Sequence, residues 1–183
     1  LCLLRLFRTN PDCVVIQDWV SKIAKLLEDR DLGVITSVMS LLLGFASSQP
    51  TVFEPLVPYV ISILTRLVVN RTCSPDYLYY FTPSPWLQVK CLRFLQYYRI
   101  PSDKTQLELL NEVLSKILVK TESSESNNKS NADHSILFEA INLIILYASD
   151  CPSHLKEHCC SLLGKFIAAK DPNTRYLGID AMT

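Results

Sequence analysis

Apolar side chains recur every three or four residues along most of the chain, and short polar or proline-containing stretches interrupt them. Residues 85–98 show this pattern most clearly. Ser84 can cap a helix there, and Pro85 suits the first helical position because its missing N–H would have no intrahelical partner. We therefore predict a helix from about Pro85, with an apolar face made of Leu87, Cys91, Phe94, Leu95 and Tyr98.

The same spacing predicts helices on both sides of this one. Asp12 is expected to cap a helix that ends at about Leu27. Another helix is expected to begin between Thr51 and Pro58, late or kinked, where Thr51 and Glu54 offer a capping box. The other predicted helices cover 1–9, 32–45, 105–119, 135–148 and 153–169, with a last helix capped by Asp171. No stretch has the alternating pattern of a β-strand.

The helices are expected to pair into hairpins that repeat along the chain. When the second helix of each pair is aligned, Leu32, Leu87, Ile136 and Thr174 fall in register, at steps of 55, 49 and 38 residues. The shortest step matches a helical-hairpin repeat of about 40 residues, and the longer steps contain insertions. The predicted fold class is an all-α, HEAT/armadillo-like α-solenoid in which each repeat buries a face on the next.

The two insertions differ in composition. Residues 121–131 contain no apolar side chain, so a disordered loop in solvent is predicted there, with a phosphorylated or partner-binding loop as the alternative. Residues 71–84 are rich in aromatic side chains, which either pack over the repeats or form a contact surface for a partner. The side chains concerned are Tyr77, Leu78, Tyr79, Tyr80, Phe81 and the nearby Trp86.

Composition excludes several classes of protein. The chain has 183 residues, 49% of them hydrophobic, so it can bury a core and is not disordered as a whole. The 18 basic and 18 acidic residues cancel, and no nucleic-acid partner is predicted. The longest apolar window recognised, 136–148, is shorter than the roughly 20 residues of a membrane-spanning helix, so no span is expected. The seven cysteines are odd in number and lack Cys-x-x-Cys spacing, which favours reduced structural thiols.

One motif is typical of catalysis. His154, Glu157 and His158 match H-x-x-E-H, in which two histidines on one helix face bind zinc and the glutamate activates water. A third ligand is hard to find in the few residues that follow, so a solvated helix surface is the preferred interpretation. The four glycines form no phosphate-binding loop. We therefore predict no enzyme activity, no cofactor, and no catalytic, cofactor-binding or metal-binding residue.

Two pairs of basic residues have helical spacing. Lys22 with Lys25 and Lys90 with Arg93 each make a small basic spot. Such spots are more typical of solvated helix faces than of phosphate sites, so we expect these four side chains to face solvent.

Several stretches of the chain resemble the trunk of the adaptin large chains. They are 1–12, 31–41, 131–141 and 173–182, and together with the rest of the pattern they extend the resemblance over essentially all 183 residues. Residues 79–90, YYFTPSPWLQVK, are most similar to the alpha type of adaptin, found in the endocytic clathrin adaptor. The sequence departs from the family pattern at Gly178, where alanine is usual, and in the loop after Lys120.

The resemblance implies a HEAT-like trunk section that acts as a structural scaffold in a heterotetrameric clathrin adaptor, supporting cargo selection and coated-vesicle formation in endocytosis. It implies a sigma-type small chain, a medium chain and a second large chain as partners, and a cytoplasmic location, peripheral on the plasma membrane at coated pits. Contacts with membrane and phosphoinositide would lie outside this section. Because both ends fall inside helical patterns, residues 1–183 are expected to be a middle section of that trunk.

Other HEAT scaffolds share the same periodicity. A nuclear-transport receptor or a phosphatase scaffold is therefore the alternative function, and it would bind a small GTPase or a catalytic subunit instead of a sigma-type chain.

Overall fold

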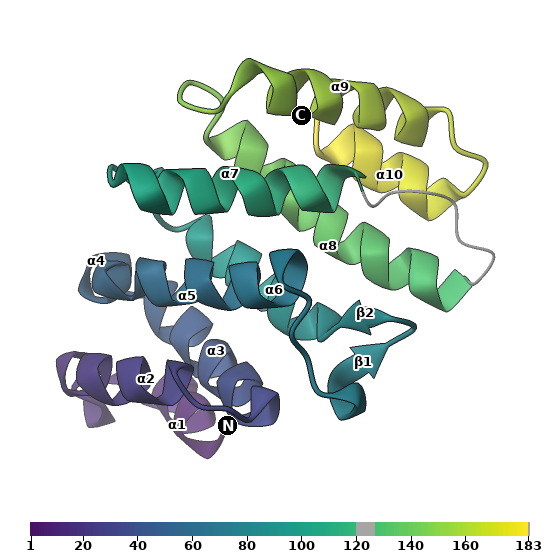
Figure 1. Cartoon of the computed structure of the whole chain (residues 1–183). Coiled ribbons are helices and arrows are strands. Elements are labelled where there is room, and N and C mark those ends of the chain that lie inside the picture. The colour runs from purple at the N-terminus through teal and green to yellow at the C-terminus, as the bar shows by residue number, and fades with distance from the viewer. Residues whose placement is uncertain (120–126, 183) are drawn as a thin grey trace.

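The computed structural model describes residues 1–119 and 127–182, which form ten α-helices arranged as two stacked layers (Figure 1). The first layer consists of α2 (Val20–Leu27), α5 (Val57–Leu64), α7 (Lys104–Val119) and α9 (Ser153–Ile167). The second layer consists of α3 (Leu32–Ala46), α6 (Pro85–Leu95), α8 (Asn127–Leu146) and α10 (Pro172–Asp180). Two further helices, α1 (Cys2–Thr9) and α4 (Pro50–Phe53), pack against α3. The predicted all-α solenoid is confirmed.

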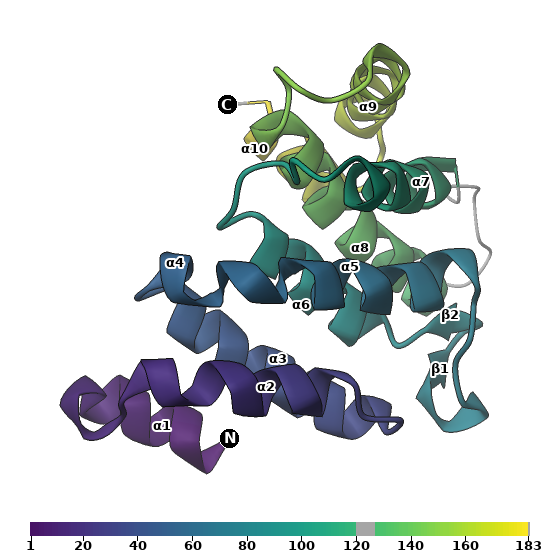
Figure 2. The ribbon, with the colours of Figure 1, turned by 60° about the vertical axis from the view of Figure 1, so that its left-hand side comes forward.

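Each first-layer helix pairs with the second-layer helix that follows it. The contacts join α2 to α3, α5 to α6, α7 to α8 and α9 to α10. Within the first layer, α2 contacts α5, α5 contacts α7 and α7 contacts α9; within the second layer, α3 contacts α6 and α6 contacts α8. Figure 2 shows the first-layer helices lying one above another along the molecule. This is the stacking of helical hairpins that the repeat pattern predicted.

Helix α6 lies at the centre of the second layer, between α3 and α8. All five residues of its predicted apolar face are buried, and Leu92 is buried with them. Burial of one such aliphatic side chain contributes about 1.5–3 kcal/mol to folding. Tyr147 of the loop after α8 donates a hydrogen bond to the carbonyl of Leu95, at 2.9 Å, which secures the end of α6 to the next repeat.

Two helices, α6 and α10, start at the predicted proline positions, and α10 has the predicted aspartate cap. Asp171 accepts a hydrogen bond from the Thr174 N–H at 2.7 Å, and Pro172 is the first residue of α10. Pro85 is likewise the first residue of α6. The predicted cap by Ser84 is wrong, because Ser84 has a left-handed backbone (φ 38°) and its side chain makes no capping hydrogen bond.

One predicted helix start in the first half of the chain is also wrong. Asp12 lies in a 3₁₀ turn, Pro11–Cys13, and α2 begins only at Val20, after a second 3₁₀ turn. The helix expected between Thr51 and Pro58 is kinked, as predicted: the short helix α4 starts at Pro50, and α5 begins at Val57, inside the expected range. The stretch passes through a 3₁₀ turn at Glu54–Leu56 and ends in a π-helical turn at Thr65–Val69.

This kinked stretch also contradicts the expectation that no segment is long and apolar enough to span a membrane. Among the described residues, Pro50–Val69 is long and apolar enough to cross a membrane by length and composition. The expectation rested on residues 136–148 alone and overlooked this longer stretch. Its helices contact α2, α6 and α7, as expected of a core helix, and core helices pass the same test of length and composition.

Helix α8 begins earlier than the sequence predicted. A loop was expected over 121–131, but residues 127–131 form the first turns of α8, while 121–126 lie outside the described residues. Lys129 and Asp133, one turn apart, form an ion pair at 3.1 Å that supports this start. The middle of α8 is buried, whereas Ile145 and Leu146 at its end are exposed. The buried residues are Ile136, Leu137, Phe138, Ala140, Ile141, Leu143 and Ile144.

The seven cysteines all lie in the described part of the chain, and none of them is paired with another. Cys91, Cys151 and Cys159 are buried, and burial raises the pKa of each thiol, most strongly that of Cys91. A buried thiol with a raised pKa stays protonated and behaves as a small hydrophobic group. These three cysteines are structural, whereas Cys2, Cys13 and Cys160 are exposed.

His134 lies inside α8, where its ring packs against the rings of Phe138 and Phe166. The sequence had placed it at the end of a loop. Burial lowers the pKa of His134 from its ordinary value of 6.5, and the nearby carboxylates of Asp133 and Asp171 oppose this shift without cancelling it. Protonation of His134 therefore acts against the packing of α8 on α9.

We expect the stability of the protein to fall as the pH decreases below about 6.5. In that range the unfolded chain binds a proton at His134 more readily than the folded chain, so protonation favours unfolding. The free energy of unfolding, measured with denaturant at several pH values between 5 and 7.5, should change less with pH in His134→Phe than in the parent protein. His154→Phe is the matched control, because His154 is exposed on α9. If the free energy of unfolding changed equally with pH in the parent protein and in His134→Phe, His134 would not be the group that lowers the stability.

Candidate functional site

The H-x-x-E-H motif lies on the outer surface of α9. His154 and Glu157 are exposed, and His158 is half-buried beside them. Within residues 1–119 and 127–182, no group of three or more His, Cys, Asp or Glu side chains could hold a metal ion. A zinc site needs at least three protein ligands, so the described residues do not form a zinc-peptidase centre.

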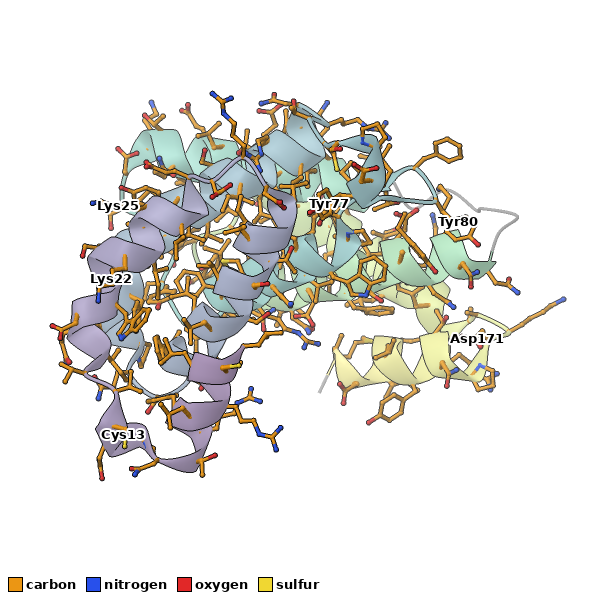
Figure 3. The ribbon with its side chains drawn as sticks, turned by 90° about the horizontal axis from the view of Figure 1, so that it is seen from below. Cys13, Lys22, Lys25, Tyr77, Tyr80 and Asp171 are labelled. Atoms are coloured by element: carbon orange, nitrogen blue, oxygen red, sulfur yellow. The ribbon has the colours of Figure 1, made fainter. Side chains whose placement is uncertain are left out.

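The two basic pairs have different surroundings. Lys22 and Lys25 lie on one outer side of α2 (Figure 3), where the ammonium of Lys22 sits 4.8 Å from the ring centroid of Trp19. Lys90 is half-buried and donates a hydrogen bond to the hydroxyl of Ser40 on α3, at 2.7 Å. Arg93 forms an ion pair with Glu139 on α8. The expectation of a solvated face fails for Lys90, which is half-buried against α3. Arg93 is exposed as expected, although it also pairs with Glu139.

The aromatic insertion folds into a small β-hairpin, which the sequence pattern did not predict. Strand β1 (Leu78–Tyr79) pairs antiparallel with β2 (Thr82–Pro83). The two residues between the strands, Tyr80 and Phe81, both have positive φ (46° and 65°), as in type I′ turns. Neither is the glycine or asparagine that usually marks such a turn, so the sequence carried no clear signal for it.

Hydrogen bonds attach this hairpin to the repeats before and after its own. The Tyr77 hydroxyl donates to Asp31, at the start of α3, at 2.6 Å. On the other side, Thr82 donates to Asp133 of α8 at 2.8 Å, and the Asn128 amide donates to the Tyr80 hydroxyl at 3.0 Å. Figure 3 shows Tyr77 close to the α3 side and Tyr80 close to α8. The hairpin therefore bridges three consecutive repeats.

Asp31 serves both α3 and the hairpin. One of its carboxylate oxygens accepts the Gly33 N–H as the cap of α3 and also accepts the Tyr77 hydroxyl. These hydrogen bonds hold the pKa of Asp31 below its ordinary value, and the same carboxylate raises the pKa of Tyr77. Both groups therefore keep their usual charge states near neutral pH, with an ionised Asp31 accepting from a neutral Tyr77.

The insertion provides both packing and exposed aromatic surface, the two interpretations that the sequence left open. Tyr77 packs inward, and the ring of Tyr79 lies 4.9 Å from that of Trp86 in an edge-on arrangement. Phe81 remains 78% exposed and Trp86 60% exposed. Such exposed aromatic side chains are enriched at protein interfaces. The hairpin and the start of α6 are therefore the candidate interaction surface.

Gly33 is a sequence signal for the contact between Tyr77 and the start of α3, and the sequence-based prediction did not use it. A Cβ atom at this position would lie 2.7 Å from the Tyr77 hydroxyl oxygen and 3.0 Å from the Asp31 carboxylate. A Cβ atom at position 33 would therefore displace the Tyr77 hydroxyl from its place beside Asp31.

We expect Gly33→Ala to loosen the hairpin, because the added methyl group displaces the Tyr77 hydroxyl. Gly164→Ala is the matched control on α9, where a Cβ atom would meet nothing within 4 Å. Gly164→Ala should raise the free energy of unfolding by about 0.5–1 kcal/mol, because alanine has a higher helix propensity than glycine. In Gly33→Ala the displaced Tyr77 hydroxyl should cancel this increase. Hydrogen exchange of amides 78–83 should be faster only in Gly33→Ala. Equal stability and unchanged exchange in the two variants would contradict the proposed contact.

Comparisons with known proteins agree with the fold. The family model described as "Adaptin N terminal region" matches residues 1–183. The chain is 45% identical over 183 residues to AP-2 complex subunit alpha-1 of Arabidopsis thaliana and 40% identical over 185 residues to AP-2 complex subunit alpha-2 of Dictyostelium discoideum. Both alignments cover 100% of this chain and 18% of the relative.

A more distant relative belongs to a different adaptor complex. The chain is 30% identical over 168 residues to AP-4 complex subunit epsilon-1 of Mus musculus, which covers 92% of this chain and 14% of the relative. The chain thus spans about a fifth of the length of the curated alpha subunits that it matches. Because the family match and the alpha-subunit alignments both cover the whole of residues 1–183, the chain belongs to the adaptin family, within the N-terminal region of its large chains.

Proposed function

We propose that this chain is a section of the trunk of an alpha-type large subunit in an endocytic clathrin adaptor complex, and that its role there is structural. The observation that carries the proposal is the gradient of identity, from 45% and 40% with alpha subunits of AP-2 to 30% with the epsilon subunit of AP-4. The alpha-like sequence of residues 79–90 forms the hairpin that joins three repeats, which adds a structural reason for the type assignment.

The fold suits a scaffold. Stacked repeats contact mainly their neighbours, so a solenoid presents a long, continuous surface on which several chains can assemble. By resemblance, the proposed partners are a sigma-type small chain, a medium chain and a second large chain. We propose that the assembled protein is cytoplasmic and peripheral on the plasma membrane at clathrin-coated pits, where it supports cargo selection. Residues 1–183 would be a middle section of the trunk, with membrane and phosphoinositide contacts in other sections.

A catalytic role has little support in the described residues. The H-x-x-E-H side chains face solvent and lack a further ligand within that part of the chain. The cysteines of the core are buried with raised pKa values, which makes them poor nucleophiles. We therefore propose a non-enzymatic protein whose contribution is shape and rigidity.

The test is assembly with a small chain. The full-length protein that contains this section is co-expressed with the sigma-type small chain of its own organism, and the mixture is separated by size exclusion with mass measurement. We expect a stable one-to-one complex. The matched control is the small chain of a different adaptor complex from the same organism, which should bind clearly less.

A folded, helical protein that binds neither small chain would contradict the adaptor proposal. It would leave the solenoid intact and point to a HEAT scaffold of another kind, such as a nuclear-transport receptor or a phosphatase scaffold. Equal binding of both small chains would contradict the assignment to the alpha type.

A further inference from the structure

The insertion at residues 71–84 is attached in both directions along the solenoid. Tyr77 donates a hydrogen bond to Asp31, the residue that caps α3, at 2.6 Å. Thr82 donates to Asp133 of α8 at 2.8 Å. Both donors belong to the same short hairpin. A single segment therefore reaches from the first repeat, α2 and α3, to the third repeat, α7 and α8, across the start of α6.

These attachments all lie where second-layer helices begin. Asp31 directly precedes α3, and the insertion directly precedes α6. Asn128, which donates to the Tyr80 hydroxyl at 3.0 Å, and Asp133 lie in the first turns of α8. Figure 3 shows Tyr77 on the α3 side of the insertion and Tyr80 on the α8 side. The insertion therefore crosses one edge of the second layer, the edge at which α3, α6 and α8 begin.

The opposite edge of the layer has a different set of polar contacts. Where α6 ends, Tyr147 donates to the carbonyl of Leu95 and Gln96 donates to the carboxylate of Glu139, each at 2.9 Å. These two contacts join α6 to α8 and do not reach α3. Bending that opens the first edge would therefore stretch at least one attachment of the insertion, whereas bending that closes this edge would stretch neither.

The backbone of the insertion is strained. In the part of the chain that the structure describes, the non-glycine residues with positive φ are Arg71, Tyr80, Phe81 and Ser84, at 51°, 46°, 65° and 38°. All of them lie in the insertion. A positive φ brings the Cβ atom of an L-amino acid close to the following carbonyl oxygen, which costs free energy at each position. Such a backbone persists only where the surrounding contacts hold it, so it would relax if the insertion were freed.

The two ends of the insertion are coupled to each other. The Ser84 N–H donates to the carbonyl of Tyr77 at 2.8 Å, and the Arg71 guanidinium donates to the carbonyl of Phe81 at 3.3 Å. Strand β1 pairs with β2 between these two contacts. A displacement at the Tyr77 end is therefore passed on to the Thr82 end. Once one end is released, the other end alone has to hold the strained backbone.

We propose that the insertion at residues 71–84 is a strap that fixes the angle between the first and third repeats and opens as a unit. While both ends are attached, the strap prevents the solenoid from opening at the edge where α3, α6 and α8 begin. Loss of either attachment frees the strained hairpin, which weakens the other attachment and allows the repeats to bend. This inference does not depend on the proposed assembly with a small chain.

Hydrogen exchange of the full-length protein, measured by mass spectrometry, tests the coupling of the two ends. Tyr77→Phe removes only the hydroxyl at one attachment, and Thr82→Val removes the hydroxyl at the other attachment without changing the shape of the side chain. We expect Tyr77→Phe to speed exchange at the far end, in amides 131–135 of α8. Thr82→Val should likewise speed exchange of amides 33–36 of α3. Each increase should be about fivefold, the factor expected from the loss of one hydrogen bond.

Tyr147→Phe is the matched control for this experiment. It also removes one tyrosine hydroxyl that joins α6 to its neighbouring repeat, but at the opposite edge of the layer. Exchange of amides 33–36 and 78–83 should stay unchanged in this variant. If Tyr77→Phe and Thr82→Val each speed exchange only at their own end, or at neither end, the two attachments do not act as one strap and the proposal is wrong.

Single-molecule energy transfer in the full-length protein tests the control of bending. Two dyes are attached through unnatural amino acids at exposed positions of the first and third repeats, Lys25 on α2 and Glu112 on α7. We expect a narrow distribution of transfer efficiency in the parent protein and a wider one in Tyr77→Phe and Thr82→Val. Tyr176→Phe is the control, because Tyr176 is 66% exposed on α10, away from the strap.

Equal widths of the distribution in the parent protein and both strap variants would show that the strap does not limit bending, and would overturn the proposal. Binding of the sigma-type small chain is measured on the same variants. A strap variant that bends more and still binds the small chain would leave both proposals standing. A parent protein that binds no small chain but loses its rigidity in the strap variants would contradict the adaptor function alone, so the two proposals can fail separately.

Discussion

The burial of α6 between α3 and α8 is the constraint on which the rest of the structure depends. A helix buried on both flanks has to satisfy its polar side chains within the protein, because an unpaired buried polar group costs about 1–3 kcal/mol. Gln88 donates to the carbonyl of Pro83, Lys90 donates to Ser40 of α3, and Gln96 donates to Glu139 of α8. These polar contacts have defined geometry, so they align three repeats where apolar packing alone would allow more freedom.

The hairpin before α6 follows from the same constraint. The chain enters α6 through Ser84, whose backbone is left-handed and whose side chain does not cap the helix, so the start of α6 needs other support. Tyr77 and Thr82 provide it by reaching Asp31 in one direction and Asp133 in the other. The insertion and the helix thus attach to the same two neighbouring repeats. This is why an insertion with so many aromatic residues is ordered.

Much of the fold could be predicted from the sequence, because helical periodicity is a local property. The helix layers, the buried face of α6 and the Asp171 cap depend on residues a few positions apart, and they were predicted correctly. The attachment of the hairpin and the ion pair of Arg93 depend on partners 46 to 51 residues away. Thr82, Asn128 and Asp133 look like ordinary loop residues until the repeats are stacked, so their pattern alone could not reveal the interaction surface.

The interaction surface differs from the rest of the solenoid in how its shape is determined. Elsewhere the repeats are joined by apolar packing and by single polar contacts such as Arg93 with Glu139 and Tyr147 with the Leu95 carbonyl. At the hairpin, Asp31 and Asp133 are held by hydrogen bonds from one short segment, so any bending between the first and third repeats would stretch one of them. Trp86 and Lys90 lie within this braced region, on the helix that both neighbours enclose.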